Sequence, residues 1–158
     1  SGQTKYGHVT IFILNTGLRA HEVYNLKWTD FHKGERTYIQ ITKSKTDNGI
    51  RKVPLNKETL SIILQQPEIS PYIFTSVGGN QLSETQMKRH NKYVRESLGI
   101  KEFHNHICRH TFATRALEKN MDVNALSKIL GHSSVAFTMQ RYVTVFDDYL
   151  FEQMKLFD

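Results

Sequence analysis

One stretch of the sequence, His-Ile-Cys-Arg-His, places three cationic or titratable side chains within reach of one another. If this stretch is helical, the spacing of three and four residues puts His106, Arg109 and His110 on one face. Such groups repel one another unless an anion sits among them, and a phosphate is the obvious candidate. A polar stripe that faces solvent is the other interpretation of this spacing.

A further arginine follows a glycine turn in the stretch Thr-Gly-Leu-Arg-Ala-His-Glu-Val. Arg19 enters a new helix there, and its guanidinium can reach a phosphate bound at the amino end of that helix. On its own, the pattern is equally typical of a solvated arginine near a helix cap.

A histidine and a tyrosine follow the end of another predicted helix. His132 stands in Leu-Gly-His-Ser-Ser, so a turn rather than a core face places its ring. Tyr142 comes later, in or beside a short predicted helix. A lone tyrosine is usually a packing residue, and the chain has seven, but the spacing from the Gly-His turn singles out Tyr142.

Two lysines occupy the predicted tip of a hairpin, in the stretch Lys-Ser-Lys-Thr-Asp-Asn-Gly (43–49). Lysines at such a tip are normally solvated and protect the sheet edge from pairing with other chains. A hairpin tip is also well suited to reach into a groove of DNA, so Lys43 and Lys45 are candidate DNA contacts.

Metal chemistry finds little support in the sequence. His104, His106 and His110 have a spacing that zinc ligands could use, but Arg109 would lie on the same face and repel a cation. The acidic residues are spread over separate elements: Asp30, Asp47, Asp122 and the pair at 147 and 148. A two-metal site needs converging carboxylates. We therefore expect no metal, and phosphoryl transfer by an amino-acid nucleophile with cationic stabilisation.

The elements that must position these residues are mainly helical. Apolar periodicity and cap signals predict helices over 8–15, 20–27, 57–66, 83–98, 106–119, 122–130, 135–143 and 147–157. Ser83 with Gln86 forms a capping box that opens one of them, and Gly99 closes it. Alternating residues predict strands over 37–42 and 50–55, joined at Asp-Asn-Gly. The fold class is therefore mainly α with a small antiparallel β-sheet (α+β).

Composition limits the classes of protein to which the chain can belong. Of its 158 residues 39% are hydrophobic, and 21 Lys and Arg against 15 Asp and Glu give a net charge of +6. This suits one folded domain and favours a polyanionic partner. No apolar run is long enough to span a membrane, and the single cysteine, Cys108, cannot form an internal disulfide.

Taken in order, these motifs resemble those of the tyrosine recombinases. The matching segments are Thr-Gly-Leu-Arg-x-x-Glu, Ser-Lys-Thr followed by Val-Pro-Leu, His-x-x-Arg-His-Thr-Phe-Ala-Thr, Leu-Gly-His-Ser and a final Tyr. The family includes phage and conjugative-transposon integrases and chromosome-dimer resolvases. Each motif alone is weak, but their shared order from about Tyr6 to the C-terminus is specific. The resemblance implies the catalytic-domain fold of this family.

The resemblance also implies a reaction and a role for each residue. A site-specific recombinase or integrase cuts and rejoins DNA through a covalent 3′-phosphotyrosine bond, without metal, ATP or other cofactor. The implied catalytic residues are Arg19, Lys45, His106, Arg109, His132 and the nucleophile Tyr142, with Glu22 and His110 in support. The implied DNA contacts are Lys43, Arg19 and Arg109, and Lys43 could serve instead of Lys45 as the hairpin lysine that protonates the departing 5′ oxygen.

Some features depart from the family pattern. Val23 and Cys108 stand where leucine is usual, and the spacing from the Gly-His turn to Tyr142 is longer by one, as in conjugative-transposon integrases. The family's N-terminal DNA-clamping and arm-binding domains have no counterpart in this sequence. We therefore expect residues 1–158 to form a single catalytic domain that ends in a tail helix at about 147–157.

The resemblance further implies partners and a location. We expect double-stranded DNA with attachment or recombination sites, a tetramer assembled on that DNA, a monomer when the domain is isolated, and no membrane. The protein would work in the cytoplasm and be encoded by a bacterium, a phage or another mobile element. The tail helix would pack either on its own domain or on a neighbouring protomer.

Two other functions are compatible with parts of the sequence. A type IB topoisomerase uses similar chemistry to relax supercoils, but the Leu-Gly-His-Ser turn and the tail favour recombination. A non-catalytic DNA-binding domain would explain the positive charge, but it would not need Tyr142 beside arginines, histidines and a lysine.

Overall fold

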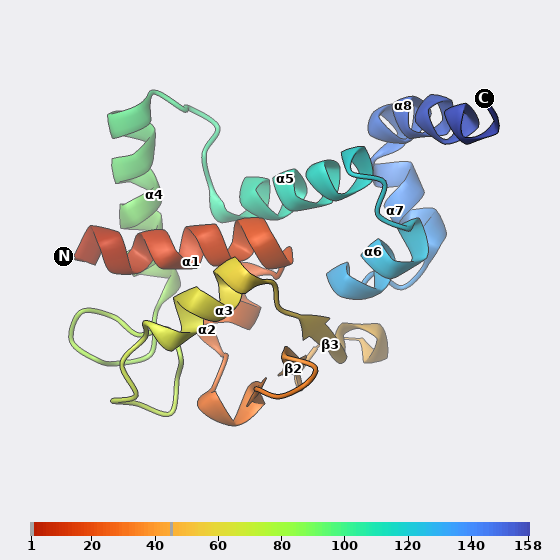
Figure 1. Cartoon of the computed structure of the whole chain (residues 1–158). Helices are drawn as coiled ribbons and strands as arrows, with labels where there is room; N and C mark the ends of the chain where they lie inside the picture. Colours follow the sequence, from red (N-terminus) through yellow and green to blue (C-terminus); the bar gives the residue numbers. More distant parts are fainter. Residues whose placement is uncertain (1, 45) are drawn as a thin grey trace.

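A small antiparallel sheet lies at one end of a helical body in the computed structural model (Figure 1), which describes residues 2–44 and 46–158. The helices are α1 (Gly2–Thr16), α2 (Ala20–Tyr24), α3 (Lys57–Leu64), α4 (Glu84–Leu98), α5 (Asn105–Glu118), α6 (Val123–Leu130), α7 (Val135–Arg141) and α8 (Val143–Met154). The strands are β1 (Phe31–His32), β2 (Tyr38–Ile41) and β3 (Arg51–Pro54), and short 3-10 turns are η1 (Trp28–Asp30), η2 (Asp47–Gly49) and η3 (Lys155–Phe157). The predicted fold class is confirmed.

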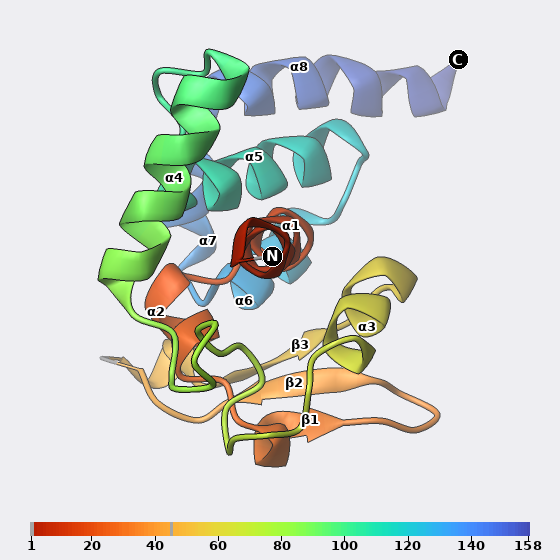
Figure 2. The same cartoon turned by 90° about the vertical axis from the view of Figure 1, so that its left-hand side faces the viewer.

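Helix α1 is the central element of the body. Figure 2 looks along α1 and shows α3, α4 and α5 around it. The apolar residues Val9, Phe12 and Ile13 repeat at helical spacing and are fully buried. Phe12 packs on Phe74 with ring centroids 5.0 Å apart. The main core is therefore built around this helix.

The sheet has the order β1-β2-β3, and both pairings are antiparallel. Ile39 lies opposite Val53, and Ile41 lies opposite Arg51. Side chains alternate along β3, so Val53 and Arg51 are buried while Lys52 is exposed. A charged residue thus occupies a core-facing position at the start of β3.

A second cluster of buried residues joins the C-terminal half of α5 to α6 and to the junction between α7 and α8. Its members are Ala113, Ala116, Leu117, Leu126, Leu130 and Tyr142. The predicted nucleophile is therefore part of the packing that holds these helices together.

The first two predicted helices have different bounds in the structure. Helix α1 begins at Gly2 rather than at residue 8, because tertiary contacts extend it: Lys5 donates to the Ser76 carbonyl at 2.9 Å, and Tyr6 packs edge-on against His90. Helix α2 ends at Tyr24 rather than at residue 27, since Asn25 caps it by donating its side-chain amide to the His21 carbonyl at 2.7 Å.

The last two predicted helices, 135–143 and 147–157, are also corrected. Helix α7 ends at Arg141, and α8 begins at Val143 and ends at Met154 before the final 3-10 turn. Tyr142 separates them with a backbone outside the helical region (φ −118°, ψ 31°), because its side chain is buried in the second cluster. Among the described residues, no helix is long and apolar enough to cross a membrane.

Candidate active site

Arg19 stands at the N-cap of α2, immediately after the turn that ends α1. Gly17 makes that turn with a positive φ of 67°, and a Cβ there would overlap the ring of Phe112, so glycine is required. The backbone N–H of Arg19 donates to Glu22 Oε1 at 2.9 Å. The Arg19 side chain is 36% exposed, and its Nη1 donates to the Leu130 carbonyl at 3.4 Å.

Arg109 reaches the same carbonyl from α5. Its Nη1 donates to the Gly17 carbonyl at 2.6 Å, and its Nη2 donates to the Leu130 carbonyl at 2.9 Å. Burial, followed by the nearby charge of Arg19, lowers the pKa of Arg109 to about 10, so the group stays charged at neutral pH. Two guanidinium groups therefore converge on one carbonyl, and this concentration of positive charge favours an anion.

His132 follows directly at the end of α6. Gly131 ends that helix in the left-handed conformation, and the His132 N–H donates to the Ser127 carbonyl at 3.0 Å. The ring Nδ1 lies 2.5 Å from the hydroxyl of Thr138, and the ring packs edge-on against Phe137. Burial and the neighbouring arginines lower the pKa of His132 to about 4, so the ring is neutral at physiological pH.

His106 lies on α5 one turn before Arg109 and pairs with an arginine of α7. Its Nε2 lies 2.8 Å from Nη2 of Arg141. Burial, then the charges of Arg141 and Arg109, lower the pKa of His106 below its usual value. The ring can therefore act as a neutral base.

Tyr142 lies beside this group of residues, although it comes from near the C-terminal end of the chain. Its side chain is only 4% exposed, and its ring packs on that of His110 with centroids 4.8 Å apart. The charge of an ionised Tyr142 would raise the pKa of Arg109, which places the two groups within electrostatic reach. The structure thus brings together Arg19, His106, Arg109, His110, His132 and Tyr142.

An open cleft of about 510 Å³ gives access to three residues of this cluster. Arg19, His106 and Arg109 line it from one side, and Lys88 and Asn91 line it from α4. The cleft is large enough for a segment of a polymeric substrate, and the cationic groups lie on its wall.

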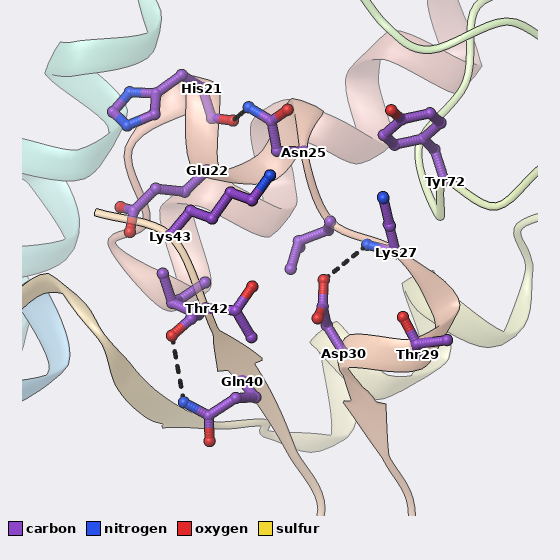
Figure 3. Close-up of a pocket in the computed structure, with 12 residues that line it drawn as sticks. His21, Glu22, Asn25, Lys27, Thr29, Asp30, Gln40, Thr42, Lys43 and Tyr72 are labelled. Carbon is purple, nitrogen blue, oxygen red and sulfur yellow. Dashed lines mark hydrogen bonds between the residues drawn. The ribbon is translucent and has the colours of Figure 1, made fainter. Parts of the chain in front are cut away.

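A second pocket of about 380 Å³ lies between α2 and β2. Figure 3 shows the Lys43 side chain running from the end of β2 past Glu22 towards Asn25. His21 lines both hollows, so the hairpin lysine and the arginine cleft are neighbours across α2. Lys45, the other predicted hairpin lysine, lies outside the described residues.

The residue types of the site do not form a metal centre. Among the described residues, no group of three His, Cys, Asp or Glu side chains is placed to hold a metal ion. His104 is used as the N-cap of α5, where its Nδ1 accepts a hydrogen bond from the Ile107 N–H at 3.3 Å. Its ring stacks with that of His106 at 6.3 Å.

Sequence reasoning missed three residues of the site. Thr138 and Arg141 hold the two histidine rings, and Arg51 forms an ion pair with Glu22 at 2.7 Å. An arginine at a core-facing position of a predicted strand was a signal that could have identified Arg51. No signal in the sequence marks Thr138, because its role depends on the turn before α7.

Comparison with known proteins places this chain in a family. Residues 3–148 match the model of the phage integrase family. The chain is 28% identical over 176 residues to the tyrosine recombinase XerC-like protein of Caldanaerobacter subterraneus subsp. tengcongensis, covering 85% of this chain and 45% of that protein. It is 32% identical over 153 residues to tyrosine recombinase XerA of Pyrococcus furiosus, covering 93% and 52%.

Solved structures show the same fold. The Tn1549 transposon integrase in complex with circular intermediate DNA superposes with a TM-score of 0.76 at 24% identity, covering 98% of this chain and 60% of that one. The XerH recombinase bound to difH substrate gives 0.70 at 22% identity, covering 88% and 43%. The chain spans about half the length of the curated relatives it matches. It belongs to the phage integrase family and has the catalytic-domain fold of the tyrosine recombinases.

Proposed function

We propose that the chain is the catalytic domain of a site-specific DNA recombinase that cleaves and rejoins strands through Tyr142. The observation that carries this proposal is the convergence of Arg19 and Arg109 on the Leu130 carbonyl, beside His132 and within electrostatic reach of Tyr142. Glu22 does not cancel this charge, because its single carboxylate pairs with both Arg51 at 2.7 Å and Arg19 at 3.7 Å, so three guanidinium groups face one negative charge.

Double-stranded DNA is the proposed substrate. The Tn1549 integrase and XerH structures are complexes with DNA, and the net charge of +6 suits a phosphate backbone. The reaction then takes place where such DNA is found, in the cytoplasm of a bacterial host.

In the proposed cleavage step, the Tyr142 oxygen attacks the scissile phosphorus and the bond from phosphorus to the 5′ oxygen breaks. A tyrosine hydroxyl ordinarily has a pKa near 10 and keeps its proton at neutral pH, so the attack needs a base. In this proposal the neutral ring of His106 is the base that takes the proton. Arg19 and Arg109 donate to the non-bridging oxygens, and His132 adds a hydrogen bond. A hairpin lysine, Lys45 or Lys43, protonates the departing oxygen.

The product is a 3′-phosphotyrosine bond and a free 5′ hydroxyl. Attack by the 5′ hydroxyl of another strand reverses the chemistry and releases Tyr142. Because the phosphodiester is exchanged for an ester of similar energy, the proposed cycle needs no ATP, metal or other cofactor.

We also propose that four protomers assemble on DNA, that the isolated domain is a monomer, and that separate segments of a longer protein clamp the DNA from its other side. Helix α8 supports the assembly: it contacts α5 and α7, yet large apolar side chains along it stay exposed. These are Val143, Leu150, Phe151 and Met154, followed by Leu156 and Phe157. Docking on a neighbouring protomer would bury them.

Covalent trapping tests the proposed function. A nicked duplex that spans the attachment junction beside the gene should become attached to the full-length protein, because the short cleaved fragment diffuses away. Tyr142→Phe should bind this DNA but form no adduct, whereas the control Tyr149→Phe should form it. An adduct with Tyr142→Phe would refute the assignment.

The same substrates separate the alternatives. Exchange between two sites supports a recombinase, and plasmid relaxation without exchange would indicate a type IB topoisomerase. DNA binding that weakens steeply with salt, without any adduct from the wild type, would indicate a non-catalytic DNA-binding domain.

A further inference from the structure

Arg51 is a buried arginine at the start of β3 whose guanidinium contacts three separate segments. Its Nη1 and Nη2 donate to the two carboxylate oxygens of Glu22 at 2.7 and 3.1 Å. Its Nε donates to the Ile129 carbonyl at 2.7 Å, and Nη1 also donates to the Gly49 carbonyl at 2.6 Å. One side chain therefore connects α2, the end of α6 and the hairpin between β2 and β3.

Two of these segments form the wall of the active site. Glu22 accepts the backbone N–H of Arg19 at 2.9 Å and lies 3.7 Å from its guanidinium. Ile129 directly precedes Leu130, whose carbonyl accepts hydrogen bonds from both Arg19 and Arg109. A Cβ on Gly131 would lie 2.8 Å from Nη1 of Arg51, so the turn that leads to His132 packs directly on this guanidinium.

The third segment carries the hairpin lysines. The Gly49 carbonyl accepts from Arg51, and a Cβ on Gly49 would overlap the Ser44 side chain, so the two arms of the hairpin are in close contact there. Ser44 lies between Lys43 and Lys45 in the sequence. In Figure 3, Lys43 runs beside Glu22, the partner of Arg51.

The geometry requires an arginine. The planar fork of a guanidinium presents five N–H donors in fixed directions, whereas a lysine ammonium is a point charge on a flexible stem. Here Nη1 and Nη2 share the Glu22 carboxylate, while Nε donates to Ile129 and Nη1 also donates to Gly49, so one guanidinium has partners in three segments.

We infer that Arg51 is a positioning residue, which fixes the hairpin against the Arg19–Arg109 cluster so that a hairpin lysine stands beside the departing 5′ oxygen. This inference rests on the proposed function. It assigns Arg51 no contact with DNA, and it predicts that the loss of Arg51 impairs protonation of the leaving group more than attack by Tyr142.

A DNA substrate with sulfur in place of the bridging 5′ oxygen separates a defect in protonating the leaving group from a defect in the attack by Tyr142. Cleavage of ordinary DNA breaks the bond from phosphorus to oxygen, and the alkoxide needs a proton from the lysine. Cleavage of the sulfur analogue releases a thiolate, which needs no proton because a thiol has a pKa of only about 8.5. A defect limited to the acid step is therefore rescued by sulfur.

The experiment compares single-turnover adduct formation by the full-length protein on the two nicked duplexes. Arg51→Lys should slow cleavage of ordinary DNA about a hundredfold, the lower range of general acid catalysis, and sulfur should restore most of the rate. Lys45→Ala and Lys43→Ala show how much the cleavage rate falls when only the proton donor for the leaving oxygen is lost. Lys52→Gln, an exposed neighbour on β3, is the matched control and should cleave both duplexes normally.

Equal losses on both duplexes, or no loss, would overturn the inference. Gly49→Ala keeps the test decisive if Arg51→Lys does not fold, since it displaces the hairpin beside Ser44 and leaves Arg51 intact. It should show the same rescue by sulfur, and a loss that sulfur does not reduce would also contradict the inference. If the wild type forms no adduct on either duplex, the proposed function fails instead.

Discussion

The Nε2 atom of His106 lies 2.8 Å from the guanidinium of Arg141. A guanidinium can only donate hydrogen bonds, so this nitrogen carries no proton and the ring is neutral. Burial is the largest cause of its lowered pKa, and Arg141 is the next. The residue before the proposed nucleophile therefore keeps the proposed base neutral, and Nε2 is free to accept a proton when Arg141 moves away.

Replacing Arg141 should change the pH dependence of cleavage. In Arg141→Gln the pKa of His106 rises towards its ordinary value. Since only the neutral ring accepts a proton, the acid limb of the rate profile should move to higher pH. Single-turnover adduct formation across the acid range measures this shift. Arg115→Gln, an exposed arginine of α5, should leave the limb in place, and an unmoved limb in Arg141→Gln would refute the role of His106.

His132 should make the fold sensitive to acid. Its pKa is about 4 in the folded chain and near 6.5 when unfolded. Between these values only the unfolded ring binds a proton, so the free energy of unfolding falls as the pH drops from 6.5 towards 4 and is greatest above 6.5. His90, His106 and His110 add to this trend, because their pKa values are lowered too.

Urea unfolding at several pH values measures this dependence. His132→Gln should lose less stability than the wild type as the pH falls through this window. An NMR titration of the ring gives an independent check. A His132 signal that titrates near 6.5 would contradict the burial that the structure gives it.

The packing of His110 on Tyr142 should affect the rate of attack. An aromatic pair of this kind contributes about 0.5–1.5 kcal/mol. If it holds Tyr142 in line, His110→Ala should slow adduct formation by about two- to tenfold with little change in DNA affinity. His110→Phe keeps a ring and should be close to the wild type. Equally slow Ala and Phe variants would indicate that the imidazole handles protons.

Local signals in the sequence were sufficient for the helices that frame the site. Ser83 with Gln86 and Gly99 predicted the bounds of α4, and α6, predicted over 122–130, is capped in the structure by Asp122 and Gly131. These caps use hydrogen bonds between residues close in the sequence, so their patterns can be recognised without the fold. The turn that carries His132 was placed correctly for this reason.

The parts that sequence reasoning missed depend on distant contacts. The break at Tyr142 contains no glycine or proline, and it arises because the ring enters a core formed by α5 and α6. The pair of Arg51 with Glu22 joins residues 29 positions apart, and no periodic pattern encodes it. The order of motifs identified the family, but only the fold shows which side chains hold the proposed catalytic groups.

The exposed end of α8 leads to the last prediction. Phe151 is 77% exposed and Phe157 is 87% exposed, so replacing both with Ser should leave the stability of the monomer within about 0.5 kcal/mol. If they dock on a neighbouring protomer, assembly on DNA should weaken by at least about a hundredfold, since burial of each ring contributes about 1.5–3 kcal/mol.

Thermal unfolding of the isolated domain and sedimentation of the full-length protein with DNA measure the two effects separately. Glu152→Ser, an exposed polar change in the same helix, should alter neither. A double variant that unfolds more easily but still assembles would show that the tail packs on its own domain. Weaker assembly by a monomer of unchanged stability would place the tail on its neighbour, because only a contact made between protomers can be lost in this way.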